Sequence, residues 1–112
     1  MHQVTLWGRL GRDVELRHSG NGNEIANLRV GVEDFYRKDG VRQKKTLWFD
    51  CVAFGGLARV CAENLHDGKG VLVTGRLNIR DYDNRDGVRV KTFEVVCDNV
   101  TFTDPPPGWD RD

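Results

Sequence analysis

Aromatic and basic side chains gather around the middle of this sequence. The segment 37–45 holds five cations and one acid, and it lies directly between Phe35-Tyr36 and the strand that carries Trp48. Three more side chains of these kinds share one face of a later segment: Arg76, Arg80 and Tyr82. Aromatic rings stack on nucleic-acid bases, while guanidinium and ammonium groups meet phosphates. The pattern indicates a surface for single-stranded nucleic acid, and the alternatives are a merely solvated loop and rings that pack in the core.

No other group of residues in the sequence matches a known metal-binding or catalytic motif. Cys51, Cys61 and Cys97 are odd in number and lack a CxxC pair, so they predict small buried residues in a reducing compartment. The segment 81–92 imitates a calcium loop, but Arg85 occupies a ligand position. The three histidines lack partners at metal-ligand spacing, and no nucleophile lies in a recognisable motif. We therefore expect no catalysis, no metal and no cofactor.

The elements that position these side chains are mostly strands. Period-two alternation and turn residues predict strands at 4–10 (continuing through 15–17), 25–35, 46–54, 71–82 and 88–102. The segment 37–45 is expected to be a loop or hairpin tip, and 57–65 has the apolar spacing of a short amphipathic helix. Five strands with one helix between the third and the fourth predict an all-β OB-fold, a Greek-key barrel.

Two of the expected strands carry informative faces. On 46–54, both faces bear large apolar groups, so one face must lie in the core and the other must be covered by something else. On 71–82, alternation assigns an inward set: Val71, Val73, Gly75, Leu77 and Ile79. The basic and aromatic residues of that strand then point outward.

The length, charge and hydrophobicity of the sequence limit the classes of protein to which it can belong. The 112 residues suit one domain, expected at 1–103, with a short Pro-rich acidic tail at 104–112. Seventeen Lys and Arg balance seventeen Asp and Glu, which excludes a uniformly basic coat, although the charge is segregated along the chain. The sequence contains neither an apolar membrane span nor a signal peptide, so we expect a cytoplasmic protein.

Several runs together resemble the bacterial single-stranded DNA-binding protein family. They follow one another in the family's order over roughly residues 3–102: Val4-Thr5-Leu6-Trp7-Gly8-Arg9-Leu10-Gly11-Arg12-Asp13, Glu15-Leu16-Arg17, Ile25-Ala26-Asn27-Leu28, Thr46-Leu47-Trp48, Phe54-Gly55-Gly56-Leu57-Ala58, Val71-Leu72-Val73-Thr74-Gly75-Arg76-Leu77 and Phe93-Glu94-Val95-Val96. The resemblance implies an OB-fold that binds single-stranded DNA without reading its sequence during replication, recombination or repair. It also implies a homo-oligomer, usually a homotetramer, with a dimer as the alternative.

Carried over by position, the resemblance assigns roles to individual residues. The base-stacking aromatics would be Trp48, Phe54 and Tyr82, together with Tyr36 or Phe35, of which we favour Tyr36. The cations along the DNA backbone would be Arg17, Arg37, Lys44, Lys45, Arg76 and Arg80. Trp7 and Phe49 are expected at a subunit interface.

The family usually ends in a long segment with an acidic tip that recruits replication and repair proteins. This chain stops at Asp112, so we expect recruitment to be absent or reduced to the residues around Trp109. The alternative function is a primosome-type accessory OB-fold protein that bridges DNA and a helicase or primase. Two further alternatives are a protein-interaction module with exposed aromatics and an OB-fold nuclease.

Overall fold

Six strands form one closed sheet. The computed structural model describes residues 1–106. The elements within them are β1 (Val4–Leu10), β2 (Glu15–His18), β3 (Glu24–Lys38), β4 (Val41–Phe54), α1 (Gly55–Asn64), β5 (Gly70–Asp83) and β6 (Arg89–Thr103). The strand order is β1-β5-β6-β4-β3-β2, and β1 also pairs with β3, which closes the barrel. β1 and β2 together act as one broken strand against β3, so the expected five-stranded OB-fold is confirmed, with its helix between β4 and β5.

Alternating apolar residues fill the barrel. The side chains that are most completely buried come from β1, β3, β4, α1, β5 and β6: Leu10, Leu28, Val30, Cys51, Cys61, Val71, Val73 and Val95. The expected helix is confirmed, and it adds Ala58 and Cys61 to this core. β1 and β3 approach closely where the barrel closes, since a Cβ on Gly8 would lie 2.1 Å from the carbonyl oxygen of Gly31. A side chain at position 8 would therefore push these two strands apart.

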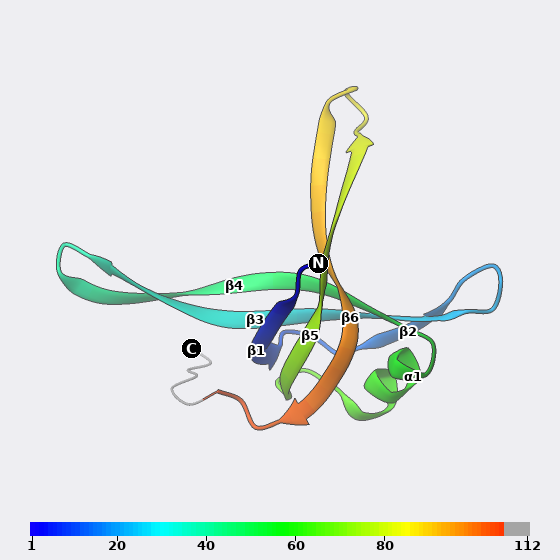
Figure 1. Ribbon diagram of the computed structural model, residues 1–112, viewed down its shortest axis with the longest axis horizontal. Helices are drawn as coiled ribbons and strands as arrows, with labels where there is room; N and C mark the ends of the chain where they lie inside the picture. The colour runs from blue at the N-terminus through cyan, green and yellow to red at the C-terminus, as the bar shows by residue number, and fades with distance from the viewer. Residues whose placement is uncertain (107–112) are drawn as a thin grey trace.

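Two long hairpins project from the barrel, β3–β4 and β5–β6 (Figure 1). The segment 37–45 is the first hairpin's tip, but most of it is strand, because the turn consists only of Asp39-Gly40. Both turn residues have positive φ, 53° and 77°, as a two-residue type I′ turn requires. The ends of these two strands were not predicted because most of their residues are polar. An arm beyond the barrel faces no core, so it does not need alternating apolar residues.

The β5–β6 hairpin corrects the expected inward set. Leu77 and Ile79 lie on the same side of their strand as the buried Val73, but they are 38% and 51% exposed. Both belong to the β5–β6 hairpin, and the described part of the chain leaves them partly open to solvent. Period-two alternation identifies a face of a strand, and it does not tell where the core beneath that face ends.

The end of the described chain lies against β1. The Trp7 indole Nε1 donates a hydrogen bond to the Asp104 carbonyl oxygen at 3.3 Å. The remainder of the expected tail, 107–112 with Trp109, lies outside the described residues. The one helix of residues 1–106 is too short and too polar to cross a membrane.

Candidate nucleic-acid interface

Strand register places most of the aromatic and basic candidates on one continuous surface, with Tyr36 and Lys45 on the opposite face. Directly paired residues of neighbouring strands share a face, and Gly31 pairs with Trp48 while Ile25 pairs with Phe54. The parallel pairing of Val52 with Val96 carries this face from β4 to β6. The register between β5 and β6 then places six further residues on this face: Arg76, Asn78, Arg80, Tyr82, Thr92 and Glu94. We call this surface the outer face.

Trp48 lies near the centre of the outer face. Its side chain is 45% exposed, and its six-membered ring lies across Gly31 to Gly11, at the end of β1. The guanidinium carbon of Arg29 is 5.7 Å from the ring centroid, within cation–π distance. Arg29 is itself held by Asp50, since its Nη1 donates to Asp50 Oδ1 at 2.8 Å. The ring is therefore supported by neighbours on the sheet and still open to solvent.

Phe54 and Tyr82 mark the two ends of the outer face. Phe54 is the last residue of β4, where the chain turns into α1, and Tyr82 lies near the tip of the β5–β6 hairpin. Both side chains are 51% exposed, which places neither ring in the core. An exposed ring at such a position is able to stack on a planar partner.

The β3–β4 hairpin carries the largest concentration of cations. Arg42 lies over the Phe35 ring at 4.4 Å, and Lys45 Nζ lies 5.4 Å from the Tyr36 ring centroid. The register places Phe35 on the outer face and Tyr36 on the opposite one, and both rings are exposed. The choice of Tyr36 over Phe35 as a base-stacking residue stays a prediction.

Two other cations of this hairpin have partners within it. Arg37 donates to the Gly40 carbonyl oxygen at 3.3 Å, and Lys44 Nζ is 3.7 Å from Glu33 Oε1. Arg17, on β2, is held in a similar way: its Nε and Nη2 donate to the Asn27 side-chain oxygen at 3.0 and 2.8 Å, with the amide oriented to accept. The hairpin thus brings basic groups and rings together, as the sequence predicted.

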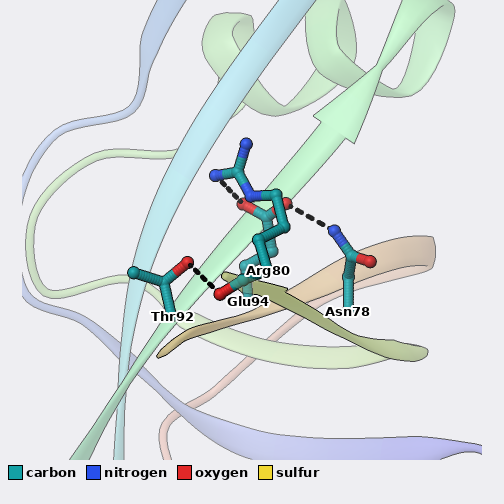
Figure 2. Close-up of polar contacts among 4 residues, drawn as sticks. All are labelled: Asn78, Arg80, Thr92 and Glu94. Atoms are coloured by element: carbon teal, nitrogen blue, oxygen red, sulfur yellow. Dashed lines mark hydrogen bonds and ion pairs between the residues drawn. The ribbon is translucent and has the colours of Figure 1, made fainter. Parts of the chain in front are cut away.

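Carboxylates are interspersed with the arginines on β5 and β6. Figure 2 shows Glu94 between two neighbours: it accepts from Asn78 Nδ2 at 3.0 Å and is 3.5 Å from Arg80 Nη2. Arg76 Nε is 3.7 Å from Asp98 Oδ1. These pairs are largely exposed, so each is weak, and exchanging the carboxylate for a phosphate costs little. They also offset part of the positive charge that the arginines give to this surface.

The two interface candidates lie away from the centre of the outer face. Trp7 is exposed on β1 beside the C-terminal segment. Phe49 points to the opposite side of β4 from Trp48 and packs partly against the core. It lines a cavity of about 420 Å³ at the opening between β4 and β6, together with Leu77, Phe93 and Val95.

Two arginines near Trp48 were missed by the sequence interpretation, Arg12 and Arg29. Arg29 was recognisable as an outward residue of its strand, but only the register shows that it lies beside Trp48. Arg12 follows Gly11 in the connection between β1 and β2, and periodicity says nothing about where such a residue points. Among residues 1–106, no carboxylate lies within ion-pair distance of the Arg12 guanidinium.

The cysteines and acids add no second site to the described part of the chain. Within residues 1–106, no three His, Cys, Asp or Glu side chains are placed to hold a metal ion. Cys51, Cys61 and Cys97 are free and buried. A hydrogen bond with the Cys97 thiol, followed by burial, raises the pKa of Cys51, and burial raises the pKa of Cys61 to about 11. Protonated thiols are poor nucleophiles and poor metal ligands at neutral pH.

Comparison with known proteins agrees with this arrangement. The family model of the single-strand binding protein family matches residues 1–103. The chain is 37% identical over 106 residues to the single-stranded DNA-binding protein of Halalkalibacterium halodurans, covering 94% of this chain and 62% of that protein. It is 34% identical over 102 residues to single-stranded DNA-binding protein 1 of Chlorobaculum tepidum, covering 89% and 63%.

A third relative is the single-stranded DNA-binding protein of Neisseria meningitidis, 30% identical over 101 residues, with 89% of this chain and 58% of that protein covered. The chain thus spans about 58 to 63% of the length of these three curated relatives. The family match extends from the first residue to the last residue of β6. The chain belongs to the single-strand binding protein family.

Proposed function

We propose that this chain binds single-stranded DNA without sequence preference and protects it during replication, recombination or repair. The observation that carries the proposal is the outer face, on which exposed Trp48, Phe54 and Tyr82 alternate with arginines. Every base has a π-face, so a row of rings binds any sequence. The role is binding and not catalysis, because rings and guanidiniums supply contacts and no reacting group.

Single strands are favoured over duplex for a geometric reason. A ring on a sheet surface reaches the face of a base only when that face is not already stacked in a helix. The two hairpins lengthen the surface beyond the barrel, and the β3–β4 hairpin adds Arg37, Lys44 and Lys45 for the phosphates. Arg17, Arg76 and Arg80 take the same role nearer the barrel.

A titration with oligo(dT) tests the proposal. We expect oligo(dT) of several tens of nucleotides to quench tryptophan fluorescence at low salt, and affinity to fall as salt displaces counterions. A duplex of equal length should bind more weakly. Unchanged fluorescence and unchanged electrophoretic mobility at low salt would refute the proposed function.

The β5–β6 hairpin offers a matched pair of variants for the same titration. Tyr82 and Ile79 are each 51% exposed and lie on opposite faces of this arm. Tyr82→Ala should weaken binding by about 5-fold or more, since base stacking is worth about 1–3 kcal/mol. Ile79→Ala should leave affinity within about twofold. Equal losses in the two variants would argue against the outer face.

We further propose that the chain assembles as a homotetramer through Trp7 and Phe49. The support is the exposed Trp7 and the cavity beside Phe49, whose walls include the apolar side chains of Leu77 and Phe93 as well as Asp50 and Glu94. Apolar surface of this kind is stabilised when a partner covers it. Native mass spectrometry should give four copies, and Phe49→Asp should lower that number. A monomeric wild-type chain would contradict this assembly.

A further inference from the structure

A small hollow beside the Trp48 ring combines the groups that a nucleotide needs. Its volume is about 270 Å³, and its walls are Gly11, Arg12, Arg29 and Trp48. The ring supplies an aromatic wall, and the two guanidiniums supply positive charge. Arg29 is already paired with Asp50, whereas Arg12 has no carboxylate partner among residues 1–106. The hollow is therefore both aromatic and cationic.

The position of the ring depends on two glycines that have no backbone reason to be glycine. The glycines with positive φ among the described residues are Gly22, Gly40, Gly55, Gly68 and Gly87, so Gly11 and Gly31 adopt backbone conformations open to any residue. Glycine within a strand such as β3 costs stability relative to alanine. What these two glycines provide is space for the indole.

The distances from a Cβ atom at each glycine to the nearest ring carbons show how little space there is. A Cβ on Gly31 would lie 2.8 and 2.9 Å from two carbons of the Trp48 ring, and a Cβ on Gly11 would lie 2.4 and 2.7 Å from the same two carbons. Cβ atoms do not approach ring carbons so closely, so either substitution forces the indole away from the sheet. We call Gly11 and Gly31 the glycine seat.

We propose that the glycine seat holds the Trp48 ring in place for the base that stacks on it under the proposed function, and that Arg12, beside Arg29, receives the adjoining phosphate in the subsite at this hollow. The inference rests on the proposed function and deepens it, because it adds residues that position the base and a cation that receives the phosphate. Arg12 is the stronger phosphate ligand of the two, since Arg29 shares its charge with Asp50.

The seat is testable in the free protein, without DNA. In a Trp7→Phe/Trp109→Phe background, Trp48 is the only tryptophan. Gly31→Ala should make its fluorescence more accessible to acrylamide and shift its emission to longer wavelength. Gly20→Ala is the matched control, because a Cβ there meets nothing within 4 Å. Identical quenching in the two variants, with wild-type circular dichroism, would overturn the seat whether or not the protein binds DNA.

A double-mutant cycle with oligo(dT) tests whether the seat acts through the ring. Trp48→Ala should weaken binding by about 5- to 150-fold, and Gly31→Ala by about 3- to 30-fold. Gly31→Ala should change affinity by less than about twofold once Trp48 is alanine. An equal loss in both backgrounds would show that Gly31 acts on the barrel and not on Trp48. Absence of binding by the wild-type chain would instead refute the proposed function.

The phosphate ligand is tested by Arg12→Gln, an exposed substitution that leaves the barrel intact. We expect weaker oligo(dT) binding and a salt slope about 0.7 lower, the value for one phosphate contact on a single strand. Arg89→Gln is the charge-matched control, since Arg89 pairs with Asp83 on the opposite face of the β5–β6 arm. Equal slopes for wild type and Arg12→Gln would remove Arg12 from the subsite.

Discussion

Glu94 and Arg80 share the outer face, with Glu94 Oε2 3.5 Å from Arg80 Nη2 and the other carboxylate oxygen accepting from Asn78. A carboxylate on a surface that receives phosphates repels them, and it also holds an arginine that would otherwise contact the DNA. The same relationship recurs at Arg76 with Asp98. Under the proposed function, the acids on this face therefore reduce the affinity for DNA and make its exchange easier.

Replacing Glu94 by Gln should increase affinity for oligo(dT). Gln keeps an oxygen for Asn78, removes one negative charge and releases Arg80, which together are worth about 1 kcal/mol, or roughly fivefold. The gain should shrink as salt is raised. Asp81→Asn is the control, because Asp81 lies on the other face of the same arm, 4.0 Å from Lys91. A gain of the same size from Asp81→Asn would point to net charge rather than to the outer face.

Gly8 is the position where barrel closure tolerates no side chain. Because a Cβ there would lie 2.1 Å from the Gly31 carbonyl oxygen, Gly8→Ala should separate β1 from β3 and lower the free energy of unfolding by about 3 kcal/mol. Urea denaturation followed by circular dichroism measures the loss. Gly20→Ala should have a transition midpoint close to that of the wild type, and a Gly8→Ala midpoint equally close would disprove the close approach.

An ion pair joins the helix to the barrel and makes stability depend on pH. Arg59 of α1 binds Glu24 of β3 through both carboxylate oxygens, with Nε donating to Oε2 at 3.0 Å. The hydrogen bond from Arg59 holds the pKa of Glu24 below its ordinary value of 4.5. A carboxyl with a lowered folded-state pKa stabilises the fold above its unfolded pKa, and this contribution disappears as pH falls through the folded pKa.

The test compares wild type with Glu24→Gln in urea at pH 6 and at pH 3.5. The wild type should lose more stability between the two pH values than the variant does. The difference should be small and should decrease in 1 M salt, because the Arg59 side chain is 60% exposed. Parallel acid profiles for the two proteins would mean that this pair contributes nothing to the pH dependence.

The positions of the strands in the sequence were predictable because each core strand alternates over many residues, as β3 does from Ala26 to Val30. What escaped prediction lies outside the barrel. The ends of β3 and β4 are polar on both faces, and Leu77 and Ile79 continue an apolar pattern past the point where the core stops. Periodicity reports burial, so it loses its meaning on arms that project into solvent.

The site was predictable as a set of residue types and much less so as an arrangement. The exposed Trp48, Phe54 and Tyr82 were identified from the sequence, but the pairing of Gly31 with Trp48 required a register. That register follows from the turn: with Asp39-Gly40 as a two-residue turn, Lys38 pairs with Val41, and counting along both strands brings Gly31 opposite Trp48. Recognising the Asp-Gly turn as type I′ would have predicted the register of β3 and β4.

The buried thiols should be chemically unreactive in the folded protein. Cys61 is completely buried in α1, and burial raises its pKa from 9.0 to about 11. The pKa of Cys51 is raised as well, by its hydrogen bond with Cys97 and by burial. At pH 8 the native protein should therefore react very slowly with Ellman's reagent, whereas all three thiols should react once urea unfolds the chain.

The same raised pKa values fix how stability changes in alkali. Below the unfolded pKa of about 9.0 the Cys61 thiol is protonated in both states, so it does not make stability depend on pH. As pH rises from 9 towards 11, the unfolded chain ionises while buried Cys61 stays protonated, so the unfolded state is favoured and stability falls. Cys61→Ala should flatten this alkaline loss in urea titrations. Prompt labelling of the native protein at pH 8 would show that these thiols are open to solvent and would remove the basis for the alkaline effect.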